Sequence, residues 1–283
     1  MPCTQTRVPR VLIRRDRQKD ALDFLELWNY KDLLWVLAER DVKLRYKQTL
    51  VGAAWVVFQP LVAAGIFSLI FNKVAGLPGP KGVPYFVFSY ASFLAWNLFS
   101  STLTKASSVL VQNSQLISKI YFPRLILPLS VVVSSILDFA IGAGLLIGML
   151  WYCRICPGWE IGLCPIWLSG LLLLGIGLGL FLGSFMVFYR DVQYVVPFLI
   201  QVLTYISPVG FTVSSIEHLP NTLQLLFWLN PISALLDAAR SSVLNTPGPD
   251  PLKLALSATT TVGVFFLGMV WFRQLERRFA DVI

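Results

Sequence analysis

Long apolar stretches separated by short charged segments fill the chain from residue 52 onward. A helix needs about 20 apolar residues to cross a bilayer core of roughly 30 Å. Six charge-poor windows of that kind are present: Gly52–Phe71, Val83–Thr104, Leu125–Tyr152, Pro165–Tyr189, Val192–Val213 and Leu254–Phe272. The pattern therefore predicts an all-α integral membrane protein with six transmembrane helices.

A seventh, shorter apolar segment at Leu219–Leu236 leaves six or seven crossings open, and the positive charges decide between them. With six crossings and a cytoplasmic N-terminus, 18 of the 23 Lys and Arg residues lie on the inner side, as the positive-inside rule requires. Seven crossings would place Arg273, Arg277 and Arg278 outside. We therefore expect six spans, with both termini in the cytoplasm.

The segment Leu219–Leu236 contains Pro220 and a central Asn230-Pro231 pair, which interrupt a helix. We predict that it dips into the outer side of the membrane between spans five and six and returns. Broken backbone is tolerated at that depth only where protein or a water-filled cavity surrounds it. The alternative is an outer-surface helix that closes a loop.

Composition agrees with a membrane location. Hydrophobic residues make up 56% of the 283 residues, charged residues 13%, and mean hydropathy is +0.69, which excludes a soluble domain of this length. A net charge of +8 could attract either nucleic acid or the inner face of a membrane. Because the cations gather on the inner side, we expect membrane lipids as partners and no nucleic acid.

The segment Trp28–Gln48, before the first span, has helical periodicity with two apolar stripes. One stripe holds Trp28, Trp35 and Val42, and the other holds Tyr30, Leu33, Leu37 and Leu44. We predict an amphipathic interface helix with one side toward lipid headgroups and the other against the chain's own spans. A solvated, charged helix is the alternative. The predicted organisation is a tail at residues 1–27, this helix at 28–48 and a six-span transmembrane domain at 49–283.

Aromatic residues crowd the second predicted span. Phe86, Tyr90 and Phe93 share one helix face, and Trp96 follows. The flat faces of aromatic rings could contact a passing sugar chain weakly, without holding it in place. These four residues are therefore candidates for lining a channel. Interfacial belts and lipid-facing Phe residues are the alternative explanation.

Asp138 lies 13 residues past Leu125, which places a charge about 20 Å along the third span. An intramembrane carboxylate is costly and is a candidate for function. Ser134 and Ser135 could satisfy it locally, so a structural role and a pathway role both stay open. One carboxylate makes no acid–base pair, which argues against an intramembrane enzyme.

The chain lacks the residues of several common sites. No G-x-x-x-x-G-K-[ST] loop occurs, so ATP with its Mg would be bound by a separate partner. Cys153, Cys156 and Cys164 cluster without the second CxxC pair or His residues of a zinc site. We therefore expect no catalytic residue, no metal and no cofactor in this chain.

The predicted cytoplasmic loop between spans two and three stays half apolar, so a partner is expected to cover it. A short helix ending near Pro123 would dock into an ATPase. The candidate docking residues are Leu116, Ile117, Lys119, Ile120, Tyr121, Phe122 and Arg124. The alternative is a membrane-edge anchor in which the two cations snorkel to headgroups.

Four stretches, in this order and spacing, carry a family resemblance: DVKLRYKQTLVGAAWVVFQPLVAAGIFSLIF, NSQLISKIYFPR, YRDVQYVVPFLIQVLTYISPVGF and LQLLFWLNPISALLDAARSSVL. The chain resembles the permease subunits of type-two ATP-binding-cassette exporters for polysaccharides and polyol phosphates. The resemblance implies a homodimer in the bacterial cytoplasmic (inner) membrane, paired with two cytoplasmic P-loop ATPase subunits. It also implies an outer gate that includes Pro208, Phe211, Asn230, Pro231 and Arg240.

The resulting hypothesis is ATP-driven export of a lipid-linked, O-antigen-like polysaccharide through a channel at the homodimer interface. The glycan would enter from the inner leaflet, its pyrophosphate attracted by cations of the interface helix. The residues expected there are Trp28, Trp35, Arg40, Lys43, Arg45 and Lys47. The rival hypotheses are a drug or small-lipid exporter of the same architecture and an intramembrane glycan or lipid transferase.

Overall fold

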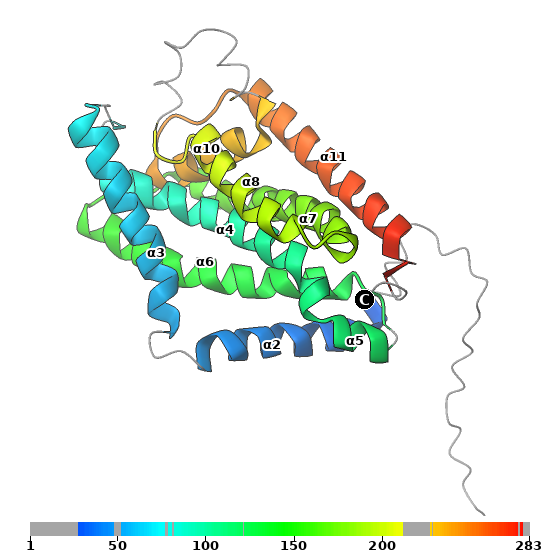
Figure 1. The fold of residues 1–283 in the computed structure, drawn as a ribbon. Coiled ribbons are helices and arrows are strands. Elements are labelled where there is room, and N and C mark those ends of the chain that lie inside the picture. The colour runs from blue at the N-terminus through cyan, green and yellow to red at the C-terminus, as the bar shows by residue number, and fades with distance from the viewer. Residues whose placement is uncertain are drawn as a thin grey trace, which may run out of the picture.

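A computed structural model describes residues 28–47, 52–76, 79–80, 82–120, 122–211, 227, 229–276 and 278–279. This part of the chain folds into helices without a strand, which confirms the all-α class (Figure 1). The elements are α2 (Lys31–Lys47), α3 (Gly52–Phe67), the π-helix η1 (Ser68–Val74), α4 (Tyr85–Gln112), α5 (Ser114–Lys119), α6 (Ile126–Tyr152), the 3-10 helix η2 (Trp159–Leu163), α7 (Cys164–Phe188), α8 (Val192–Ile206), α10 (Pro231–Leu244) and α11 (Pro251–Glu276).

Four helical segments of the described residues are long and apolar enough to cross a membrane: Ala54–Val74, Ile126–Tyr152, Trp159–Phe188 and Pro251–Glu276. They correspond to predicted spans one, three, four and six. Helix α4 has 28 residues but carries many Ser and Thr side chains, and α8 has only 15 residues. The chain is therefore an integral membrane protein with four such helices among its described residues, and the count of six stays a prediction.

Helix α4 lies at the centre of the bundle and packs against α3, α6, α7 and α10. Glycines let α7 approach its neighbours closely. A Cβ added at Gly179 would come within 2.6 Å of the Ala106 Cβ on α4, and one added at Gly268 on α11 would overlap the Gly177 carbonyl oxygen on α7. Such glycine seams allow membrane helices to pack backbone against backbone.

Helix α2 lies along the first half of α6 (Figure 1). Near its start, Leu37 is buried in a cluster with Phe122 and Ile126, and near its end Arg45 reaches Asp138. The two-sided pattern predicted for this segment is largely present, because Tyr30, Leu33 and Leu37 face the cluster while Trp28 and Trp35 are 69% and 64% exposed.

Leu44 departs from that pattern. The sequence placed it on the same stripe as Leu37, which is buried, yet the Leu44 side chain is 53% exposed. At this end of α2 the inward position is taken by Arg45 and Tyr46, which both bond Asp138. Polar contacts therefore replace apolar packing in the last turn of the helix.

Candidate functional site: a charged cavity

A cavity of about 430 Å³ opens between α3, α4, α6 and α8, beside the end of α2. One wall is a polar strip on α4, formed by Asn97, Ser100, Ser101 and Thr104. The same cavity is lined by Gln59 from α3, Ser135 from α6, and the charged residues Arg45, Lys105 and Asp138. It therefore combines a hydroxyl- and amide-rich wall with a cluster of charges.

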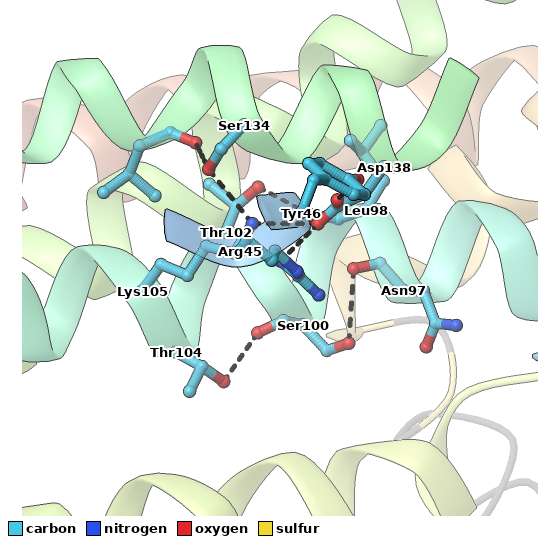
Figure 2. Close-up of polar contacts among 11 residues, drawn as sticks. Arg45, Tyr46, Asn97, Leu98, Ser100, Thr102, Thr104, Lys105, Ser134 and Asp138 are labelled. Carbon is cyan, nitrogen blue, oxygen red and sulfur yellow. Dashed lines mark hydrogen bonds and ion pairs between the residues drawn. The ribbon is translucent and has the colours of Figure 1, made fainter. Parts of the chain in front are cut away.

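Asp138 is the centre of that cluster (Figure 2). Its Oδ2 accepts from Arg45 Nη1 at 2.5 Å and from Lys105 Nζ at 2.9 Å. Its Oδ1 accepts from the Tyr46 hydroxyl at 2.6 Å. Lys105 also donates to Ser134 Oγ at 3.1 Å. Three helices, α2, α4 and α6, are thus joined through one carboxylate.

The electrostatics of the cluster are unequal, because two cations face one carboxylate. The Asp138 side chain is 10% exposed and that of Lys105 23%, whereas that of Arg45 is 43% exposed. Desolvated charges of opposite sign stabilise one another, and among the described residues these two cations share the Asp138 carboxylate. Burial and the hydrogen bond to Asp138 hold the pKa of the Tyr46 phenol far above its usual value, so this group stays a neutral donor.

The nearby serines, which the sequence left open as local partners of Asp138, do not bond its carboxylate. Ser134 donates to the Val131 carbonyl, and the buried Ser135 hydroxyl has no hydrogen-bond partner in the described part of the chain. The true partners come from residues 92, 93 and 33 positions away in the sequence. Sequence reasoning missed Tyr46 and Lys105, and the only signal for Lys105 was its place at the end of an apolar window.

The remaining cations of the predicted interface helix make contacts within the chain. Arg40 pairs with Asp41 at 2.8 Å and donates to Asn113 Oδ1, at the junction of α4 and α5, at 2.8 Å. Lys43 pairs with Glu39, one turn away, at 2.5 Å. The Lys47 side chain lies outside the described residues. Of the predicted cations whose side chains the structure describes, Arg45 reaches the cavity.

The predicted channel-lining aromatic residues pack into the core of the chain. Tyr90, Phe93 and Trp96 are buried, and Phe86 is half-buried. The Tyr90 hydroxyl donates to the Gly142 carbonyl at 3.1 Å. The Phe93 and Phe67 rings pack edge to face, with 4.8 Å between their centres. In this structure the cavity is lined by the polar strip of α4, and a channel-lining role for the four aromatic residues stays a prediction.

The predicted docking segment divides into inward and outward residues. Ile117 and Phe122 are buried in the cluster that holds Leu37, and Leu116 is half-buried against it. Lys119 and Ile120 are exposed, and Tyr121 lies outside the described residues. Among the described docking candidates, Lys119 and Ile120 therefore place a cation and an apolar side chain on the outward surface at the end of α5.

Arg124 serves an internal contact. Its backbone N–H donates to Glu276 Oε1 at 3.1 Å, its guanidinium donates to the Glu276 carbonyl, and it lies 5.7 Å from the centre of the Phe279 ring. This residue ties the loop before α6 to the end of α11.

The five predicted outer-gate residues lie together. Arg240, buried within α10, donates to the carbonyls of Pro208 and Phe211 at 3.3 and 3.4 Å. Asn230 caps α10 by accepting from Ile232 N–H, and it donates to Ser207 Oγ at 2.8 Å. The Pro231 carbonyl accepts from Ser257 on α11.

Arg240 also contacts the start of α4. It donates to Ser92 Oγ at 3.2 Å, pairs with Asp237 and lies 4.1 Å from the centre of the Phe88 ring. One guanidinium therefore joins α4, α10 and the segment after α8.

In the part of the chain that the structure describes, no three His, Cys, Asp or Glu side chains gather as a metal site. Cys153, Cys156 and Cys164 are free thiols. The cavity offers hydrogen bonds and positive charge, which suit binding of a polar or anionic molecule.

Comparison with known proteins adds a family to this geometry. The family model described as ABC-2 type transporter matches residues 32–244. The chain is 26% identical to the "O-antigen export system permease protein RfbA" of Myxococcus xanthus, over 91% of this chain and 98% of that protein. Two Klebsiella pneumoniae proteins of the same name are 26% and 27% identical, over 89% of this chain and 95% of each relative.

Proposed function

This chain belongs to the ABC-2 type transporter family, and from that membership we propose that it is the permease of an ATP-driven exporter of a lipid-linked, O-antigen-like polysaccharide. It is a transport component rather than an enzyme. Membership also implies an ATPase partner, because the energy for ABC transport comes from ATP.

The observation that carries the glycan assignment is the similarity to three O-antigen export permeases over nearly their whole length. A similarity restricted to one span would only reflect apolar composition. Here it covers the interface helix, the cavity and the outer-gate residues together. The polar strip of α4 supports the same substrate class, because Ser, Thr and Asn side chains can exchange hydrogen bonds with sugar hydroxyls.

The assembly that we propose is a homodimer in the bacterial inner membrane, with six spans per chain and both termini cytoplasmic. Two P-loop ATPase subunits bind ATP and Mg and dock at the end of α5. Exposed Lys119 and Ile120 are the candidate contacts there. Helix α2 acts as the cytoplasmic interface helix, and the outer gate includes Pro208, Phe211, Asn230, Pro231 and Arg240. Residues 219–226 and 228 of the predicted re-entrant segment lie outside the described residues.

In the proposed cycle, ATP binding closes the ATPase subunits and moves α5. Helix α5 follows α4 directly and shares the Leu37 cluster with α2, so its displacement reaches both helices. The two permease chains then part, and the glycan enters beside α2 and leaves past the outer gate.

The first test is deletion of the gene in its native cell, with the glycan followed on both sides of the membrane. We expect loss of the glycan from the surface and accumulation of its lipid-linked form inside. Wild-type complementation should restore the display. Unchanged display with altered sensitivity to drugs would instead support a small-molecule exporter.

A companion measurement identifies the energy source. The chain is purified in a gentle detergent and its stoichiometric partners are identified by mass spectrometry. A P-loop ATPase at one copy per permease is expected. Turnover of substrate by the purified chain alone would contradict the exporter.

A further inference from the structure

Uncharged polar side chains line the cavity without hydrogen bonds of their own. Ser135 on α6 is fully buried, and its hydroxyl has no partner in the described part of the chain. On α4, the Asn97 amide and the Ser101 hydroxyl also bond no other described residue. Figure 2 shows the Asn97 amide pointing away from the Asp138 cluster, while its backbone carbonyl accepts from Ser100. Three side chains thus keep their donors and acceptors open toward one space.

The position of Ser135 makes its open hydroxyl costly. Helix α6 is one of the helices long and apolar enough to cross a membrane. Ser135 lies nine residues after Ile126, the first residue of α6, which is about 14 Å along the helix. A buried polar group without a partner is uncommon, and at membrane depth it costs free energy unless water or a ligand bonds it. A molecule in the cavity would supply the missing bond.

The neighbouring wall of the cavity is apolar. Leu94, Phe139, Pro197 and Ile200 line it beside the open polar groups. A sugar ring has apolar C–H faces and a rim of hydroxyls, so it needs both kinds of surface at once, and the flat face of an aromatic ring suits its C–H face. A lipid chain would leave the polar groups without partners. The mixed wall therefore favours a sugar over a lipid.

We propose that this part of the cavity, called here the sugar pocket, binds one sugar residue of the exported glycan through Ser135, Asn97 and Ser101, together with Gln59 on α3. The proposal rests on the proposed function for the presence of a glycan, and it deepens that function by naming residues that determine specificity. Each permease chain then contacts its substrate at a site of its own. None of the charged residues of the cavity is required for it.

The hydrogen-bonding capacity of these side chains matches sugar hydroxyls. A serine hydroxyl donates and accepts, and an amide has two N–H donors and a carbonyl acceptor. Ser100 and Thr104, on the same helix, already donate to carbonyls of α4, so they have less to offer a ligand. A site built to bond hydroxyls discriminates against analogues that lack them. The cavity volume of about 430 Å³ falls within the usual range of small-ligand pockets.

The first test compares two serines of α6. The complete complex in nanodiscs binds radiolabelled lipid-linked glycan extracted from the deletion strain, and Kd is measured. Ser135→Ala removes a hydroxyl without a described partner, so the variant should unfold at the wild-type temperature or higher, while Kd rises about three- to tenfold. Ser130 donates to the Leu127 carbonyl, and Ser130→Ala should leave Kd unchanged. An unchanged Kd in Ser135→Ala would overturn the sugar pocket.

The second test follows access to α4. Ser101→Cys and Thr102→Cys are made separately in a cysteine-free chain. Thr102 is fully buried, donates to the Leu98 carbonyl and lies beside Gly175 of α7, so a small charged methanethiosulfonate should modify only the Ser101→Cys variant. Mild acid releases the oligosaccharide from its carrier. At about ten times its Kd, this free oligosaccharide should slow the modification about tenfold.

The outcomes separate sugar, carrier and water. If only the lipid-linked form slows the modification, the carrier fills the cavity and the sugar pocket is wrong. If neither form slows it, the cavity holds water and the sugar pocket is again refuted. In both cases the exporter stands, provided that the deletion strain loses surface glycan and accumulates the lipid-linked form. A deletion strain with unchanged surface glycan would refute the exporter itself.

Discussion

Single residues carry the connections of this protein, and most join segments far apart in sequence. Asp138 was identified from the sequence because a carboxylate in an apolar window is conspicuous. The partners of Asp138 were not identified from the sequence, because Arg45 and Lys105 lie on other helices and the rotation of a helix is set by its packing. Periodicity shows which residues share a face and leaves the facing neighbour unknown.

Arg240 permits a direct stability test. Arg240→Met removes the buried guanidinium and leaves Asp237 without its cation, so we expect the free energy of unfolding to fall by about 3 kcal/mol. Thermal unfolding in detergent measures the change. The double variant Arg240→Met/Asp237→Leu should recover much of it, and an equal loss in both variants would contradict a role for the ion pair.

At the scale of helices, the sequence predicted most of the elements and their approximate ends. It placed α2 and the four long apolar helices, because hydrophobic length and charge define them. It did not predict that the aromatic face of α4 is core while the Asn97–Thr104 strip lines the cavity. Both faces of that helix are compatible with a lined channel, and only the neighbouring helices decide.

The seam between α7 and α11 is one element-scale prediction. Gly268→Ala puts a Cβ against the Gly177 carbonyl, and we expect destabilisation of about 1–3 kcal/mol. The matched control is Gly263→Ala on the same helix, where an added Cβ meets nothing within 4 Å. Detergent unfolding should leave that control as stable as the wild type, or more stable by up to about 1 kcal/mol. Equal effects of the two changes would argue against close packing at Gly268.

The outward surface at the end of α5 gives a second prediction at the scale of helices. Ile120→Asp places a charge on the exposed apolar side chain proposed to meet the ATPase, so co-purified ATPase should fall about tenfold, a change of about 1.4 kcal/mol. Quantitative mass spectrometry of the purified complex measures it. Trp159→Asp, an equally drastic change on exposed η2, should retain the partner. Full retention by Ile120→Asp would move the docking surface elsewhere.

For the whole molecule, the distribution of positive charge makes a prediction about sidedness. Cys156, exposed between α6 and η2, should react with a membrane-impermeant maleimide added from the outer face, in a variant whose other cysteines are Ser. A cysteine-free variant with Ser118→Cys on α5 should react only after the membrane is opened. The reverse result would invert the topology and remove α5 from the side of the ATPase.

The π-helix η1 has a consequence for how this chain tolerates changes in length. The hydrogen bond of a π-turn spans one more residue than that of an α-turn. The segment Ser68–Val74 therefore contains a residue that α-helical geometry would not need. Deleting one residue here should tighten the turn to α geometry and leave α4 where it is, whereas the same deletion within α6 would rotate Asp138 by about 100° away from Arg45. Gaps in alignments of related permeases should therefore collect at the end of the first span and avoid the helices that build the cavity.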